Sequence, residues 1–113
     1  SDRLSQRARA LIGARQNRLS LSIASCWEMS LKVGLGRLSL QDSSVDYIQR
    51  QILCNDFSLL PVSLAHTWAI QALPSHHNDP FDRMLVAQAT VEGITLLTAD
   101  VQLAKYPGPV QRV

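Results

Sequence analysis

Three acidic residues, Glu28, Asp82 and Asp100, are the side chains of this sequence best placed to take part in chemistry. Glu28 and Asp100 each come shortly after an apolar run that has the length of a β-strand. Asp82 lies where the first turn of a helix is expected, because Pro80 suits the first position of a helix. Ligands of parallel sheets collect beyond the carboxyl ends of the strands, so we expect the three carboxylates to share one cleft.

Carboxylates that share a cleft repel one another unless a cation lies between them. Hard oxygen ligands of this kind favour Mg²⁺ or Mn²⁺. Such an ion can hold phosphate oxygens and activate a water molecule for phosphodiester hydrolysis. The sequence therefore points to a metal-dependent hydrolase of phosphodiesters, with Asp82, Asp100 and Glu28 as the candidate metal ligands.

Each acid also has a purely structural interpretation, which the sequence leaves open. Glu28 can pair with Ser25 in a capping box, and Asp82 can stabilise the positive end of a helix dipole. Asp79 suits the N-cap of the helix that contains Asp82, and Asp100 can cap the short helix expected after it. For each acid taken singly, capping is the commoner use of a carboxylate at such a position.

Other reactive side chains give weaker signals. His76 and His77 lie in a polar loop, where neighbouring histidines more often face solvent or brace the loop than bind a metal. Ser25 has no base at a spacing that the sequence can reveal, and Cys26 and Cys54 have no positively charged neighbourhood. Nucleophilic catalysis is therefore not expected.

Short apolar strands alternate with helices along the chain. The expected strands cover residues 19–23, 57–62 and 94–97, and the expected helices cover residues 4–12, 26–32, 44–54, 64–72, 80–92 and 101–105. This alternation is typical of a parallel sheet with helices on both faces, so the expected fold class is α/β. Trp27 and Trp68 lie on apolar helix faces, and we expect both to pack in the core.

The length of 113 residues predicts one domain, residues 1–113, with a single core. A hydrophobic fraction of 46% excludes a disordered chain. No apolar stretch approaches the ~18 residues that a membrane span needs, and no secretory leader is recognisable. Two cysteines are too few for a disulfide framework, so we expect a cytoplasmic protein that does not contact a membrane.

The net charge of +2 is unevenly distributed. Residues 1–18 hold five arginines and one acid, a local charge of +4, which leaves −2 for the other 95 residues. The planar guanidinium group of arginine can donate paired hydrogen bonds to phosphate oxygens, so this segment could bind a polyanion. The alternative, which composition alone favours, is an ordinary solvated helix face.

Six short motifs are spread over nearly the whole chain. They are Ser25-Cys26-Trp27-Glu28, Gly36-Arg37-Leu38-Ser39-Leu40, Leu73-Pro74 with His77, Asp79-Pro80-Phe81-Asp82-Arg83, Ala87-Gln88-Ala89 and Thr98-Ala99-Asp100. Together they resemble PIN domains, and most closely the VapC-type toxins of bacterial toxin–antitoxin pairs. The most specific part of the resemblance is the Asp-Pro-Phe-Asp-Arg motif followed by Thr-Ala-Asp.

The resemblance implies a three-layer α/β/α sandwich around a central parallel sheet, and an endoribonuclease that depends on Mg²⁺ or Mn²⁺. It also implies a cognate antitoxin protein that holds the enzyme inactive, and a homodimer, which the apolar faces around the two tryptophans also favour. Asp82 is implied as a direct metal ligand, Asp100 as a direct or water-mediated ligand, and Glu28 as the residue that orients the water or a second ion. Thr98 is implied as a hydroxyl that braces the site, with Asp79 as a supporting residue.

The sequence departs from the family pattern at its N-terminus. The family's first strand, with the acid at its end, has no counterpart before the helix expected over residues 4–12. Asp2 does not replace that acid, because it precedes a surface helix rather than ending a buried strand. We therefore expect the first strand to be missing and the ribonuclease activity of this chain to be impaired. The alternative function is a non-catalytic PIN-like module that binds an antitoxin or RNA.

A phosphate-handling α/β domain of the receiver or phosphatase type is a third class of function with clustered acids. Such a site needs a lysine near the carboxylates. Lys32 and Lys105 are the lysines of this sequence, and neither is expected to follow the end of a strand. The third class therefore ranks below the other two.

Overall fold

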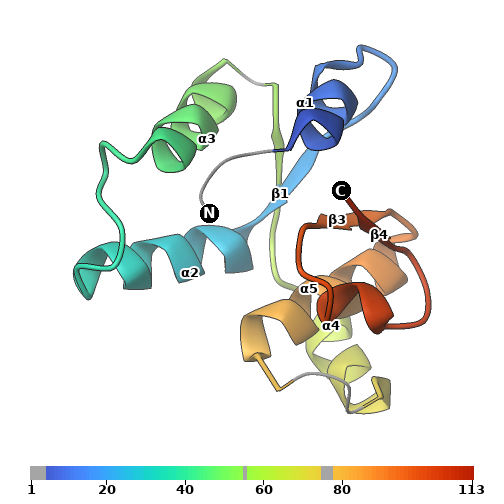
Figure 1. Ribbon diagram of the computed structural model, residues 1–113. Coiled ribbons are helices and arrows are strands. Elements are labelled where there is room, and N and C mark those ends of the chain that lie inside the picture. The colour runs from blue at the N-terminus through green and yellow to red at the C-terminus, as the bar shows by residue number, and fades with distance from the viewer. Residues whose placement is uncertain (1–4, 55, 75–77) are drawn as a thin grey trace. The chain divides into compact units, whose positions relative to one another are not determined.

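A computed structural model describes residues 5–54, 56–74 and 78–113 of the chain. The chain divides into two compact units, Ser1–Pro61 and Val62–Val113, which we call the first unit and the second unit (Figure 1). Each unit is described by itself. None of the described helices combines the length and the apolar character that a membrane crossing requires.

The first unit consists of three helices and two parallel strands. In chain order these are α1 (Gln6–Gly13), β1 (Ser20–Ser22), α2 (Ile23–Gly34), α3 (Ser43–Leu53) and β2 (Ser58–Leu60). The strands pair in parallel with Ser20 opposite Ser58, Leu21 opposite Leu59 and Ser22 opposite Leu60. Figure 1 shows β1 running directly into α2, so no loop separates this strand from its helix.

Helix α2 begins earlier than the sequence predicted. Its N-cap is Ser22, whose Oγ accepts a hydrogen bond from the backbone N–H of Ala24 at 3.0 Å. The prediction that Ser25 is the N-cap, with Glu28 as its capping-box partner, is therefore wrong. Ser22 takes this role because the extended backbone of the strand end already has the conformation that an N-cap requires. Glu28 consequently lies in the second turn of α2 rather than the first.

Helices α2 and α3 leave an open apolar hollow between them. The hollow has a volume of about 240 Å³, and its apolar lining includes Met29 and Val33 of α2 and Val45, Ile48 and Ile52 of α3. Val45 is the member of this set that is fully buried. The apolar stripe predicted for residues 44–54 therefore faces α2, as an amphipathic helix does when it covers a neighbour.

The second unit consists of two α-helices, two short 3₁₀ helices and two parallel strands. In chain order these are α4 (Leu64–Ala69), η1 (Ile70–Ala72), α5 (Pro80–Glu92), β3 (Leu96–Thr98), η2 (Leu103–Lys105) and β4 (Val110–Arg112). The strands pair in parallel with Leu96 opposite Val110, Leu97 opposite Gln111 and Thr98 opposite Arg112. Val86, Leu103 and Tyr106 form the core of this unit, and Leu73, Leu96 and Val110 pack against them.

Both ends of helix α5 have the residues that the sequence predicted for them. Asp79 is the N-cap with Pro80 at the first position, and Gly93 ends the helix in the left-handed conformation at φ 67°. The strand after it starts later than expected, at Leu96. The backbone N–H of Ile94 donates to the carbonyl of Ala89 at 3.1 Å, so Ile94 still belongs to the helix terminus.

The α/β fold class predicted from the sequence is confirmed, since each unit combines helices with a parallel pair of strands. The prediction that Trp27 and Trp68 pack in the core is wrong, because they are 61% and 64% exposed. Both sit on short helices whose inward positions are taken by other residues, Ala24 in α2 and His66 in α4. A single domain over residues 1–113 stays a prediction.

Candidate active site

Asp82 is held at the N-terminus of α5 by the residue that caps this helix. The Oδ1 atom of Asp79 accepts hydrogen bonds from the backbone N–H groups of Phe81 at 2.8 Å and of Asp82 at 3.1 Å. Asp82 itself is half-buried in the first turn, where the helix dipole stabilises a negative charge. Asp79 therefore acts as a positioning residue, and Asp82 is the carboxylate that it places.

Arg83 connects the start of α5 to two other parts of the second unit. Its Nη1 donates to the carbonyl of Pro74 at 3.0 Å and to the hydroxyl of Tyr106 at 3.1 Å. Its Nη2 donates to the carbonyl of Ile70 at 3.2 Å. In the sequence Arg83 stands out only as part of a motif, because partners 9, 13 and 23 residues away leave no local pattern. These bonds fix the backbone that carries Asp82.

Asp100 is placed by the turn that follows strand β3. Its Oδ1 accepts from the backbone N–H of Gln102 at 2.7 Å and, more weakly, from that of Leu103 at 3.4 Å. The hydroxyl of Thr98 accepts from the backbone N–H of Asp100 at 3.0 Å. Asp100 thus holds the turn that leads into η2, whose N-cap is Gln102 rather than Asp100. Its Oδ2 takes no part in these bonds, so this oxygen can still bind a ligand.

Asp82 and Asp100 lie at the same end of the α5–β3 segment. The left-handed turn at Gly93 reverses the chain, so β3 runs back along α5, which it contacts. Val86 is one helical turn after Asp82 on the same face, and it packs against Leu103, whose N–H faces Asp100. The start of α5 and the end of β3 therefore bring both acids to one edge of the second unit.

The family model that describes the PIN domain matches residues 1–109. The chain belongs to the PIN domain family. No curated protein and no solved structure matches the chain. PIN domains are typically metal-dependent nucleases, and they generally use divalent metal ions.

Glu28 belongs to the first unit of this PIN domain. It is half-buried on α2, and its Oε2 lies 3.4 Å from the Nζ of Lys32, one helical turn further along. Within residues 5–54, 56–74 and 78–113, no group of three or more His, Cys, Asp or Glu side chains is arranged to hold a metal ion. Because Glu28 and the two aspartates lie in different units, a site made of all three acids stays a prediction.

The second unit supplies a donor set that fits a hard divalent ion. Asp82 and Asp100 offer carboxylate oxygens, which are the ligands that Mg²⁺ and Mn²⁺ favour. The Oδ2 of Asp100 is oriented because its Oδ1 is fixed to the backbone of η2. His76 and His77, which the sequence suggested for loop bracing, lie outside the described residues.

A buried histidine network was missed by sequence analysis. His66 is 1% exposed; its Nδ1 accepts from the backbone N–H of Ser63 at 3.0 Å, and its Nε2 lies 2.9 Å from the Oε2 of Glu92. Acceptance at Nδ1 assigns the proton to Nε2, which donates to Glu92. The buried Gln88 approaches Nδ1 at 3.4 Å. The available signal was Ser63-x-x-His66, a capping box with histidine in place of Glu or Gln.

Cys26 does not have the properties of an activated nucleophile. Burial raises the pKa of the Cys26 thiol above its usual value, and a backbone hydrogen bond only partly offsets this. A raised pKa leaves less thiolate at neutral pH, and the thiolate is the reactive form. That catalysis proceeds without a protein nucleophile stays a prediction.

Proposed function

We propose that this PIN domain is a Mg²⁺- or Mn²⁺-dependent endoribonuclease that hydrolyses phosphodiester bonds of RNA. The observation that supports it most strongly is the pair Asp82 and Asp100 at one end of the α5–β3 segment. The backbone N–H of Asp82 donates to the carboxylate of Asp79, and the carboxylate of Asp100 accepts from the backbone N–H of Gln102, so both residues are positioned before any ligand binds. Such preorganisation reduces the cost of gathering like charges around an ion.

The described side chains have separate tasks in the proposed reaction. A divalent ion bound here would supply positive charge for the developing charge on the phosphate and would make a water molecule more acidic. Asp82 would hold the ion with its half-buried carboxylate, and Asp100 would contribute Oδ2 directly or through a water. Thr98 keeps the turn that carries Asp100 in place. Glu28, as the resemblance implies, orients the attacking water.

The biological setting that we propose is a toxin–antitoxin pair in the cytoplasm. The motifs that resemble VapC-type toxins support it, and they imply a cognate antitoxin and a homodimer as partners. Helix α2 and its C-cap residue offer exposed apolar side chains for such contacts, namely Trp27, Leu31 and Leu35. Exposed apolar groups of this size are more common where a partner binds than on a surface that stays in water.

RNA cleavage tests the proposal. The chain, and the chain preceded by an apolar strand ending in Asp, are incubated with labelled single-stranded RNA and Mn²⁺. We expect cleavage in the extended form, and a loss of at least 100-fold in Asp82→Asn and Asp100→Asn, because each removes a negative ligand. Asp56→Asn is the matched control, since this exposed carboxylate lies in the first unit.

The same experiment separates the enzyme from its alternative. No cleavage by either form, or cleavage that persists in Asp82→Asn, contradicts the ribonuclease proposal. RNA or antitoxin binding without cleavage would instead support the non-catalytic PIN-like binding module.

A further inference from the structure

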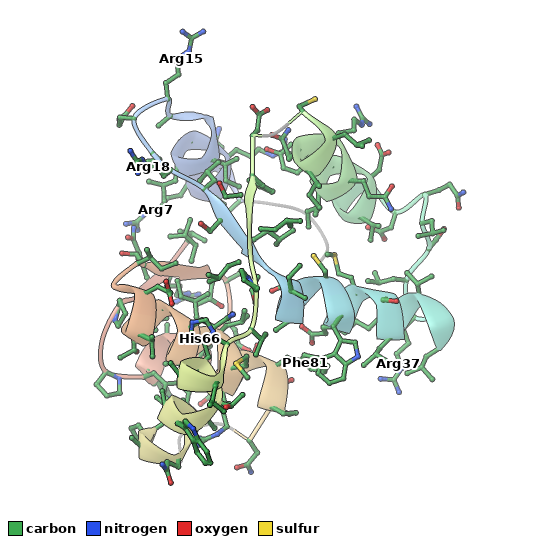
Figure 2. The ribbon with its side chains drawn as sticks, turned by 180° about the vertical axis from the view of Figure 1, so that it is seen from behind. Arg7, Arg15, Arg18, Arg37, His66 and Phe81 are labelled. Carbon is green, nitrogen blue, oxygen red and sulfur yellow. The ribbon has the colours of Figure 1, made fainter. Side chains whose placement is uncertain are left out.

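Three arginines of the first unit form a surface that we call the arginine face: Arg7, Arg15 and Arg18. Arg7 belongs to α1, and the other two belong to the turn that leads from α1 to β1. All three side chains are exposed. Figure 2 shows Arg7 and Arg18 projecting to the same side of the ribbon and Arg15 extending outward from the tip of the turn, with Arg37 at the far end of α2.

Hydrogen bonds between residues close in sequence fix the backbone that carries the arginine face. The Oγ of Ser5 accepts from the N–H of Ala8 at 3.0 Å and caps the start of α1. At the other end, the side chain of Asn17 donates to the carbonyl of Leu11 at 2.8 Å, and its backbone N–H donates to the carbonyl of Ala14 at 3.1 Å. The turn is therefore defined, which reduces the entropy lost when a ligand binds to its arginines.

Among the described residues of α1, its following turn and β1, no carboxylate balances this charge. Residues 5–27 contain no Asp or Glu, and none of the three arginines has an ion pair within the part of the chain that the structure describes. Elsewhere in the same unit, Arg50 pairs with Asp46 and Lys32 with Glu28. The guanidinium groups of the arginine face thus keep their donors for an external anion.

The chemistry of this surface fits phosphate better than a protein or a membrane. No large apolar side chain of residues 5–22 is exposed, whereas protein interfaces are anchored by buried aromatic and apolar groups. A helix that binds a membrane also needs an apolar face to insert, and α1 turns Ala8, Leu11 and Ile12 inward or partly inward. The exposed neighbours of the arginines, Gln16 and Asn17, are polar.

We propose that the arginine face binds successive phosphates of single-stranded RNA, away from the bond that is cut. The proposal rests on the proposed function, since it assigns the substrate of the same enzyme a second contact. Arginine is weakly hydrated and donates through a planar fork, which suits phosphate oxygens. Contacts of this kind carry affinity without reading sequence, and they weaken as salt rises.

The test measures RNA binding without catalysis. The full chain is titrated into fluorescein-labelled single-stranded RNA in EDTA, at several salt concentrations, and anisotropy reports binding. Each phosphate contact contributes about −0.7 to the slope of log K against log salt, so Arg7→Gln, Arg15→Gln and Arg18→Gln should each weaken binding about fivefold at 0.1 M salt. The triple variant should lose about two units of slope.

Two control variants remove the same single charge from other surfaces of the same unit. Arg9 lies two residues from Arg7, about 200° around the helix, and Arg37 follows α2. Arg9→Gln and Arg37→Gln should change binding less than twofold. Thermal melting followed by circular dichroism should be unchanged in all five, because every side chain is exposed.

Equal losses in the face and control variants, an unchanged salt slope in the triple variant, or equally tight binding of polyglutamate would overturn the proposal. The EDTA condition separates it from the nuclease proposal. RNA binding that depends on the arginine face, with no cleavage in Mn²⁺ by either the chain or its extended form, would sustain the arginine face while rejecting the ribonuclease. Cleavage that depends on Asp82 but not on these arginines would sustain the ribonuclease proposal and overturn the proposal for the arginine face.

Discussion

The two units of this PIN domain use their residues differently. In the second unit, the buried apolar side chains include the larger Leu103 and Tyr106, and polar side chains such as Arg83 and His66 are bonded across elements. In the first unit, the buried apolar side chains are small or few, namely Ala8, Ala24 and Val45. Its charged side chains mostly face outward, and the ion pairs among its described residues join neighbours one turn apart on a helix.

This difference indicates that the second unit positions candidate site residues, whereas the first unit provides surfaces for binding. The second unit fixes Asp82 and Asp100 through a core and a set of hydrogen bonds, as a catalytic site requires. The first unit offers the arginine face and the apolar side chains of α2, which suit contacts with RNA and with a partner. We therefore expect core substitutions to act most strongly in the second unit.

The largest effect is expected from Tyr106→Ala. Tyr106 is 3% exposed, belongs to the core, and accepts a hydrogen bond from Arg83 through its hydroxyl. Loss of a buried aromatic ring costs about 3 to 5 kcal/mol, and the cavity would also release the start of α5. Urea unfolding followed by circular dichroism measures the loss, and hydrogen exchange locates it in residues 62–113.

Tyr106→Phe is the matched control for this substitution. It keeps the ring and removes the hydroxyl, so the expected loss is about 1 kcal/mol, the net value of one hydrogen bond. If Tyr106→Ala costs no more than Tyr106→Phe, the second unit does not rely on this core.

A smaller effect is expected in the first unit, at the junction of β1 and α2. Ser22→Ala removes the N-cap of α2 and should cost about 1 kcal/mol. Ser25→Ala changes a residue inside the helix and should cost little or slightly stabilise, because alanine favours helix interiors. Urea unfolding of both variants compares them. A larger loss from Ser25→Ala would return the N-cap to Ser25 and contradict the observed start of α2.

These positions also show what a sequence can predict. Asp79-Pro80 and Gly93 were assigned to the ends of α5 because each has a conformational preference that no neighbour shares. Ser22 and Ser25 are equally good caps by type, and only the pairing of β1 with β2 decides between them. The strand at Val110–Arg112 was expected only as an extended tail, because its pairing partner β3 is not local.

The same reasoning applies to the candidate site. Asp82 and Asp100 could be selected from sequence because each follows a recognisable helix start or strand end. The roles of Arg83 and His66 could not, since their hydrogen bonds reach residues up to 23 and 26 positions away. A local pattern predicts a side chain's element, whereas its partners depend on how the elements pack.

Isothermal titration calorimetry with Mn²⁺ tests the central claim most directly, that Asp82 and Asp100 together hold one divalent ion. The unmodified chain should bind Mn²⁺ with a stoichiometry of about one, and the same titration of Asp82→Asn and of Asp100→Asn should each show at least about tenfold weaker binding. Asp56→Asn should bind as the unmodified chain does. Unchanged binding in both site variants, or no binding by the unmodified chain at millimolar Mn²⁺, would contradict the account.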